Sequence, residues 1–198
     1  ASLKTELNGT YLTTLLGTSN VNSKLNTAIV SAKWHLGGAS TDNYQTLTAE
    51  GIYRQERNTS AIYSGNPASI YAKVGLMYPS DYGYATVGGS TTNKANCRAK
   101  ELYNWDSSSY SDCKNNDWVY KSQSISWGAN KNEWLLSPYS SSSTYAAYLY
   151  STGFVSLYGN RNVDNLKLAV RPTFYLDSSI LKIVGTGDGT KDNAYRVG

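Results

Sequence analysis

Apolar residues in the first half of the chain recur at spacings near four, which is the period of an amphipathic helix. The pattern predicts four helices, over residues 2–16, 22–34, 48–58 and 91–105. Ser2 and Thr48 stand where N-cap residues are expected, and Gly9 weakens the first helix because glycine lowers helix stability. The fourth helix places Cys97 in its first turns.

The pattern changes after Trp118, where short β-type runs are separated by Gly, Ser, Asn and Asp. The runs are EWLLSP, YAAYLYS, GFVSLYG, LKLAVRPTFYL and ILKIVG. Their order predicts an antiparallel meander, because strands do not alternate with helices as a parallel sheet requires. The predicted fold class is therefore α+β, with helices in the first half and an antiparallel β-sheet in the second half.

Alternation within these runs predicts the core of the sheet. Central strands of one antiparallel sheet should bury Trp134, Leu136, Val170, Phe174 and Leu176. Arg171 should face away from Val170 and either pair with a carboxylate or reach solvent. Since neither an internal repeat nor a long linker divides the sequence, a single domain over residues 1–198 is expected.

Composition points outside the cell. Eighteen tyrosines and five tryptophans stand against two phenylalanines and one methionine, in a background rich in Ser, Asn, Thr and Gly. Such residues suit surfaces that are partly exposed to water, so an extracellular or cell-surface location is expected. The sequence shows neither a signal peptide nor an apolar run long enough for a membrane span. Because Ala1 is not a natural initiator, the chain is expected to be part of a longer precursor.

The net charge of +4 comes from scattered Lys and Arg residues. Nucleic-acid binding is not expected, because these residues form no basic stripe that would neutralise phosphates.

Cys97 and Cys113 are the two cysteines of the chain, and such a pair has three possible roles. A structural zinc site needs four soft ligands, whereas the chain adds only one histidine, His35. A redox pair is usually more closely spaced and lies next to a βαβ unit. A disulfide suits an even cysteine count in an extracellular chain, so a bond between Cys97 and Cys113 is predicted. Closing this loop would stabilise the fold by about 3 kcal/mol.

Several blocks of sequence together resemble a known family. They are AKWHLGG, IYRQERN, AKVGLMYPSDYGYATVGGSTTNKANC, DCKNNDWVY, EWLLSP, STGFVSLYG, AVRPTFYL and GTGDGTKDNAYRV. In this order they resemble a family of uncharacterised domains, of undefined biochemical role, from surface proteins of Gram-positive gut bacteria. The family has a cysteine pair of its own at the positions of Cys97 and Cys113.

A second resemblance concerns the Trp-Leu-Leu-Ser-Pro, glycine-turn and Val-Arg-Pro blocks. These are similar to the C-type-lectin-like fold of formylglycine-generating enzymes, of bacterial lectin-like adhesins and of the variable proteins of diversity-generating retroelements. The resemblance implies a compact α+β domain whose irregular, ligand-facing surface lies close to the C-terminal strands. Oxidase activity is not implied, because the two cysteines do not match the reactive cysteine site of formylglycine-generating enzymes.

Catalytic and metal-binding interpretations have weaker support. A Ser-His-Asp triad would have to use His35, for which a structural role beside Trp34 is the alternative. A glycosidase pair could be drawn from Asp81, Asp106, Glu133 or Asp188, although the sequence gives no distance between them. Asp188 and Asp192 offer oxygen ligands for Ca²⁺ without the pattern of a calcium loop. We therefore expect no enzyme activity, cofactor or metal.

The remaining candidate site is the segment 139–165, where tyrosines mix with Ser and Asn. The proposed binding residues are Tyr145, Tyr148, Tyr150, Tyr158, Asn160, Arg161 and Asn162. A hairpin around Gly153 should join YAAYLYS to GFVSLYG and gather these residues on one partly exposed surface. The alternative is that some of the rings simply cover the sheet, because alternation places Tyr148 and Tyr150 on the same face.

Two function classes follow from these observations. In the first, the chain is a non-catalytic adhesion module that binds a glycan or a protein at a cell surface. In the second, it is a structural subunit of a surface filament, such as a pilin-like ectodomain, and binds copies of itself. The sequence favours binding slightly over assembly.

Overall fold

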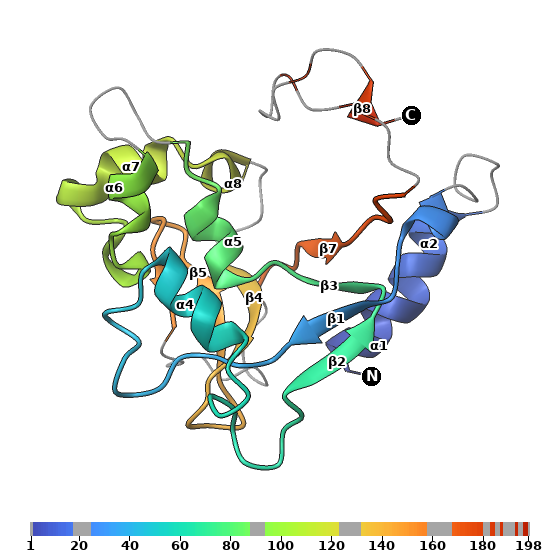
Figure 1. The fold of residues 1–198 in the computed structure, drawn as a ribbon, viewed down its shortest axis with the longest axis horizontal. Helices are drawn as coiled ribbons and strands as arrows, with labels where there is room; N and C mark the ends of the chain where they lie inside the picture. Colours follow the sequence, from blue (N-terminus) through green and yellow to red (C-terminus); the bar gives the residue numbers. More distant parts are fainter. Residues whose placement is uncertain are drawn as a thin grey trace. The chain divides into compact units, whose positions relative to one another are not determined.

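A computed structural model describes residues 2–17, 25–87, 94–122, 132–157 and 168–179, together with residues 183–184, 187, 193 and 196–197. The fold is α+β, with helices and antiparallel sheets, as the sequence predicts (Figure 1). The chain divides into two compact units. Unit 1 comprises Ala1–Trp34, Tyr71–Gly75 and Pro172–Gly198, and unit 2 comprises His35–Ile70 and Leu76–Arg171. The expectation of a single domain stays a prediction.

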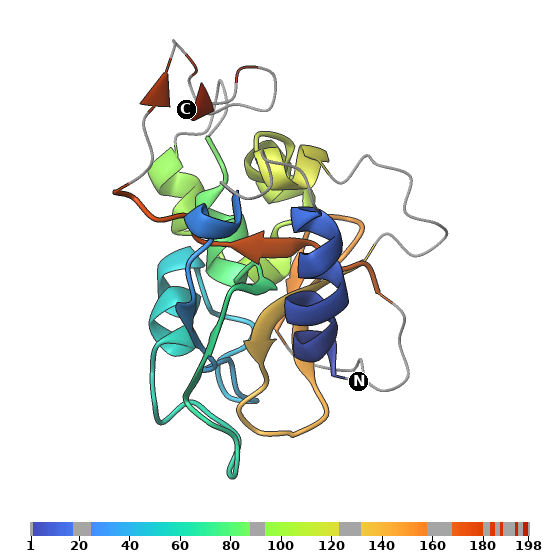
Figure 2. The same ribbon diagram turned by 90° about the vertical axis from the view of Figure 1, so that its right-hand side faces the viewer.

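Unit 1 begins with a helical stretch, drawn in blue in Figure 2, and one of its turns is π-helical. It runs through α1 (Leu3–Glu6), the π-helix η1 (Leu7–Tyr11) and α2 (Leu12–Leu16). The Ser2 side chain accepts a hydrogen bond from the backbone N–H of Thr5, which confirms the predicted N-cap. Gly9 lies inside the π-helical turn, so the expected weak point is a local change of helical type.

The predicted second helix is largely wrong. Within its described part, residues 25–28 are helical, and the chain then forms strand β1 (Ala32–His35), which pairs with β2 (Ser69–Ala72). Trp34 is 1% exposed, and its indole N–H donates to the carbonyl oxygen of Ala72 at 2.9 Å. A short apolar run fits either a helix or a strand, and here long-range pairing decides for the strand.

Strands also occur where only helices were expected. β1, β2 and β3 (Val74–Leu76) all precede residue 77, so the order of helices first and strands second is wrong. β3 pairs with β7 (Pro172–Phe174), and β8 (Ile183–Val184) pairs with β9 (Arg196–Val197). The β3–β7 pair explains the difference, because a C-terminal strand finds its partner in the N-terminal half of the chain.

The helices of unit 2 are short. They are α4 (Ala49–Glu56), α5 (Pro79–Tyr84), α6 (Lys94–Arg98), α7 (Ser111–Asn115) and α8 (Trp118–Ser122), with 3₁₀ turns η2 (Leu102–Asn104) and η3 (Ser108–Tyr110). The Thr48 side chain accepts from the backbone N–H of Gly51 at 3.1 Å, which confirms the predicted cap of α4. The predicted fourth helix is shorter than expected and ends at Arg98, because Glu101 leaves the helix to form a β-bridge with Thr48.

The first three of the five predicted runs form the sheet of unit 2, an antiparallel meander, whereas the fourth run supplies β7 to β3 and the fifth supplies β8 to β9. β4 (Glu133–Pro138), β5 (Ala146–Leu149) and β6 (Val155–Ser156) lie in this order, and α5 packs against β4 and β5. Tyr148 stands opposite Trp134 on one side and Ser156 on the other. β5 is therefore the central strand of this sheet.

The predicted sheet core is only partly correct. Trp134 is buried, whereas Leu136, Val170, Phe174 and Leu176 are half-buried. These residues do not share one sheet, because Phe174 lies on β7 and Leu176 forms a bridge with Ile29. Arg171 pairs with the carboxylate of Glu133 at 2.9 Å, which is one of the two outcomes predicted for it.

The core of unit 2 joins its helices to its sheet. Tyr82 on α5 and Trp105 beside η2 are fully buried, and their ring centroids lie 5.3 Å apart. Leu149 of β5 and Val155 of β6 complete the same cluster from the sheet. Gly83 permits the close approach of α5 and α4, because a Cβ atom there would lie 2.6 Å from the Cβ atom of Ala49. The β5–β6 hairpin is therefore built on a packed base.

Candidate functional site

The turn between β5 and β6 is a tight hairpin, as the sequence predicts. The Tyr150 N–H donates to the carbonyl oxygen of Phe154, and the Gly153 N–H donates to that of Tyr150, each at 2.9 Å. Gly153 has a φ of 102°, a conformation that side-chain-bearing residues rarely adopt. Only glycine fits this position without strain, which explains why Gly153 stands at this point of the turn.

Side chains from three different elements bind the backbone of this turn. The carbonyl oxygens of residues 151–153 accept, in this order, from the Tyr120 hydroxyl at 3.5 Å, from Lys114 Nζ at 2.9 Å and from the Tyr82 hydroxyl at 2.8 Å. Surface turns usually leave their carbonyl groups to water. This turn is instead anchored to the helices of unit 2 through three successive peptide groups.

Two further contacts fix the turn from its sides. Asp106 accepts a 2.6 Å hydrogen bond from the Thr152 hydroxyl, and the Asn132 side chain accepts a 2.9 Å bond from the Ser151 N–H. Asp106 belongs to the loop closed by the cysteines, whereas Asn132 directly precedes β4. The turn is consequently pre-organised, because little ordering remains to be done when a ligand arrives.

A row of aromatic rings begins at this turn. Tyr150 stacks on Phe154 with ring centroids 4.9 Å apart, Tyr103 meets the edge of Phe154 at 5.7 Å, and Tyr44 meets Tyr103 at 5.5 Å. We call these four residues the aromatic row. All four are half-buried, so each ring is held by packing and still exposes part of its surface.

The binding tyrosines proposed from the sequence differ in burial and in the rings that they contact. Tyr150 belongs to the aromatic row, and Tyr145 is half-buried beside Tyr139, with ring centroids 6.4 Å apart. Tyr148 is only 2% exposed and lies between the rings of Trp134 and Tyr150, at 6.1 and 6.2 Å. A residue that binds a ligand needs an exposed ring. Tyr148 has none, so it fits the alternative interpretation, in which the ring covers the sheet.

Tyr158, Asn160, Arg161 and Asn162 lie outside the described residues. Conversely, the sequence analysis missed Tyr44, Tyr103 and Phe154. Phe154 could have been found from its place directly after Gly153, whereas Tyr44 and Tyr103 carry no local signal and join the row only through the fold.

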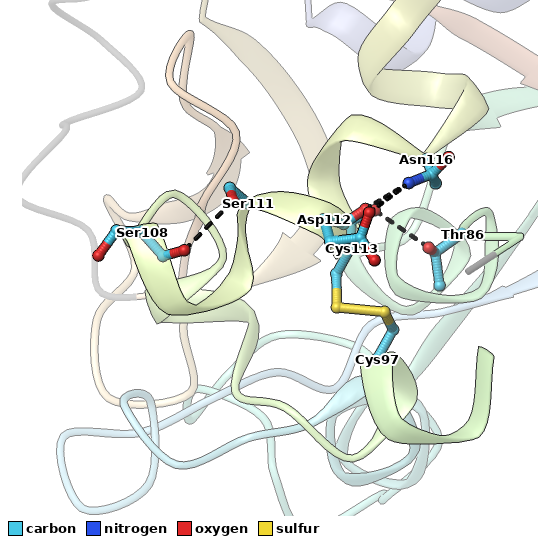
Figure 3. The surroundings of a disulfide bond; sticks show 7 residues. All are labelled: Thr86, Cys97, Ser108, Ser111, Asp112, Cys113 and Asn116. Carbon is cyan, nitrogen blue, oxygen red and sulfur yellow. Dashed lines mark hydrogen bonds between the residues drawn. A yellow bond between two sulfur atoms is a disulfide. The ribbon is translucent and has the colours of Figure 1, made fainter. Parts of the chain in front are cut away.

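The predicted disulfide between Cys97 and Cys113 is present, with their Cα atoms 5.4 Å apart (Figure 3). It joins α6 to α7, and the two residues are 0% and 2% exposed. The loop that it closes carries both Tyr103 and Asp106. The disulfide therefore restrains the segment that supplies one ring of the aromatic row and one side contact of the turn.

Three of the four carboxylates considered for glycoside cleavage, Asp81, Asp106 and Glu133, have a structural partner. Asp81 accepts a hydrogen bond from the Tyr78 N–H at the start of α5. Asp106 binds Thr152 of the turn, and Glu133 pairs with Arg171, as described above. Asp188 and Asp192 lie outside the described residues. Among the described residues, no three His, Cys, Asp or Glu side chains gather in a way that could hold a metal ion.

His35 lies where the chain enters unit 2. Its backbone N–H donates to the Tyr78 hydroxyl at 2.6 Å, and the same hydroxyl donates to the His35 carbonyl oxygen at 3.1 Å. Tyr78 itself is 1% exposed. These two bonds involve only the backbone of His35, so the structural role expected for its side chain stays a prediction.

Two buried carboxylates escaped the sequence analysis. Glu56 is 0% exposed and accepts from the Ser80 hydroxyl at 2.6 Å, from the Ser80 N–H at 2.9 Å and from Arg57 at 3.0 Å. Burial raises the pKa of Glu56 to about 7, although Ser80 and Arg57 oppose the change and only the nearby Asp81 adds to it. Since Ser80 is also buried, this cluster ties the end of α4 to the start of α5.

Asp117 is the second buried carboxylate. Its Oδ1 atom accepts from the N–H groups of Val119 and Tyr120 at 2.9 and 3.0 Å at the start of α8, whereas Oδ2 has no partner among the described residues. Burial raises the pKa of Asp117 to about 7, against the opposing effects of these two hydrogen bonds and of Arg171. Its role at the start of α8 is to satisfy backbone donors that the helix leaves free.

Comparison of the chain with protein-family models, with curated proteins and with solved structures gave no match. The two resemblances drawn from the sequence remain expectations. In the described ranges, no helix combines the length and apolar character needed to cross a membrane.

Proposed function

We propose that the chain is a non-catalytic extracellular recognition domain of a bacterial surface protein, which binds a glycan or a protein through the β5–β6 turn and the aromatic row. The disulfide is compatible with a secreted or extracellular location. The observation that carries the proposal is the row itself, in which four half-buried rings adjoin a fixed turn.

Ring surfaces of this kind favour binding for two physical reasons. Tyrosine and phenylalanine offer a large contact area at a small cost in side-chain entropy, and packing against neighbouring rings has already removed most of that freedom. Two exposed polar residues lie close to the row in the sequence. Thr152 stands two positions before Phe154, and Asn104 directly follows Tyr103. A ligand could therefore stack on the rings and bond to the rim of the site.

The test is binding to immobilised mucin and to an array of glycans, with Tyr103→Ala and Phe154→Ala compared with the unaltered chain. If these rings are hot spots, each substitution should weaken binding by about thirtyfold. Tyr71→Ala is the matched control, because Tyr71 is 67% exposed on β2 in unit 1 and lies outside the row. Melting temperatures recorded in parallel identify any variant that lost its fold.

Mucin treated to remove its glycans separates the two ligand classes, since binding that survives the treatment assigns a protein ligand. If the unaltered chain binds neither mucin nor any glycan of the array, or if Tyr71→Ala weakens binding as much as the row variants, the proposal is wrong. The filament alternative predicts instead that the chain associates with itself in sedimentation experiments, and that the row variants abolish this association.

A further inference from the structure

Lys114 on α7 touches the β5–β6 turn in two ways. Its ammonium group donates to the carbonyl oxygen of Thr152 at 2.9 Å. Its methylene stem covers Gly153, because a Cβ atom on this glycine would lie 2.4 Å from Lys114 Cδ and 3.0 Å from Cγ. The ammonium also lies 5.6 Å from the ring centroid of Tyr120, whose hydroxyl donates to the preceding carbonyl of the turn. The side chain is therefore held along its whole length.

This arrangement differs from the usual behaviour of lysine. A surface lysine normally keeps its rotamer freedom and its ammonium group in water. Lys114 is half-buried and, of the three side chains that donate to the turn carbonyls, it is the charged one. A hydrogen bond from a charged donor is stronger than one from a neutral hydroxyl. Lys114 is consequently the charged anchor among the three.

The helix that carries Lys114 is itself held from outside. α7 has five residues, too few for a helix to be stable alone. The neighbouring Cys113 is bonded to Cys97, and its carbonyl oxygen accepts from the Thr86 hydroxyl at 3.1 Å (Figure 3). The Asn116 side chain closes the end of the helix on Asp112, with bonds of 2.8 and 2.9 Å. The base of the Lys114 side chain is thus fixed by the disulfide together with these hydrogen bonds.

We infer that Lys114 is a positioning residue of the recognition turn, and that the Cys97–Cys113 disulfide acts on this turn through it. Phe154 and Tyr150 flank the turn and belong to the row, so a displaced turn moves two of its four rings. The functional meaning of this inference rests on the proposed recognition function. The structural part of the inference, that Lys114 holds the turn, is independent of that function.

The test measures hydrogen exchange of the Tyr150 and Gly153 amides by NMR in the full chain. Lys114→Met keeps the stem and removes the ammonium, and it should accelerate exchange of these two amides by about tenfold. Lys114→Arg restores a charged donor and should return both amides to nearly their original rates. Lys100→Met is the control, because Lys100 lies in the same disulfide loop and faces the ring of Tyr110.

A second pair of variants keeps the test decisive if Lys114→Met fails to fold. Gly153→Ala places a Cβ atom against the Lys114 stem, and Lys114→Ala removes that stem. Part of the damage done by Gly153→Ala should therefore disappear in the double variant, although the strain of a positive φ remains. Purely additive effects of the two substitutions, or unchanged amide exchange in Lys114→Met, would overturn the inference.

The role of the disulfide is tested by the same two amides. Cys97→Ala with Cys113→Ala should accelerate their exchange in a chain that still unfolds cooperatively, and adding Lys114→Met should then have little further effect. A full additional effect of Lys114→Met would show that the disulfide does not act through this residue. Exchange rates require no ligand, so failure of this inference is distinguishable from failure of the unaltered chain to bind mucin or glycans.

Discussion

The hydroxyl of Tyr82 on α5 donates a 2.8 Å hydrogen bond to the carbonyl oxygen of Gly153, which lies 71 positions further along the chain. Tyr82 is 0% exposed, and burial raises its pKa well above the usual value, with smaller effects from Asp117, Tyr120 and Asp106. The hydroxyl therefore remains protonated, and thus a donor, at neutral pH. This bond connects the core of unit 2 directly to the candidate recognition turn.

Tyr82→Phe should lower the free energy of unfolding by about 1–2 kcal/mol, because it leaves the buried carbonyl group of Gly153 without its donor. Denaturant unfolding measures the change. Tyr120→Phe is the matched control, since the Tyr120 hydroxyl reaches Ser151 only at 3.5 Å and its ring is half-buried. Equal costs for the two substitutions would show that the Tyr82 bond has no special weight.

Loss of the disulfide should lower the free energy of unfolding by about 3 kcal/mol, because the unfolded chain regains the entropy of an open loop. Cys97→Ala with Cys113→Ala is the variant, and denaturant unfolding is the measurement. Reducing agent should destabilise the unaltered chain by a similar amount while leaving the variant unaffected. Two free thiols in protein kept under oxidising conditions would contradict the bond itself.

The buried carboxylate of Glu56 makes stability depend on pH. Its pKa is about 7 in the folded chain against 4.5 for an ordinary glutamate, so between these values the folded state keeps a proton that the unfolded state has released. Stability should therefore fall as pH rises from 4.5 to 7, by about 3 kcal/mol for this group alone. Asp117 acts in the same direction over its own window, from 3.8 to about 7.

Glu56→Gln removes the titrating group, so the slope of unfolding free energy between pH 5 and pH 7 should become shallower. Asp117→Asn should reduce the slope further. Glu50→Gln is the control, because Glu50 lies at the exposed start of α4, where it pairs with Arg54. Denaturant unfolding at several pH values measures the slope of the unfolding free energy for each variant. A slope unchanged by both buried substitutions would mean that neither carboxylate is protonated in the folded chain near neutral pH.

Local signals in the sequence were read correctly where a residue acts on its own neighbourhood. Ser2 and Thr48 cap the helices that follow them, because a cap depends only on backbone groups three residues away. The hairpin around Gly153 is local in the same sense. The helix predicted over residues 22–34 is wrong after residue 28, because its apolar spacing fits two periods and the deciding partner, β2, lies far along the sequence.

The candidate site was harder to predict for the same physical reason. Alternation showed that Tyr148 and Ala147 point to opposite faces of β5, but it could not show that both faces are covered, as their exposures of 2% and 3% now reveal. Tyr44 and Tyr103 reach Phe154 from distant segments, and no pattern within one segment indicates such a meeting. The cysteine pair, in contrast, followed from residue counting and composition.

The most direct test of the recognition account is an NMR titration of the full chain with the O-glycans released from mucin, or with intact mucin if these do not bind. The account predicts that the largest chemical-shift changes fall on Tyr103, Tyr150, Thr152 and Phe154, and that they disappear in Phe154→Ala. The account is contradicted if the shifts gather elsewhere, for example around the exposed Tyr71 of β2, or if saturating ligand leaves the aromatic row unchanged.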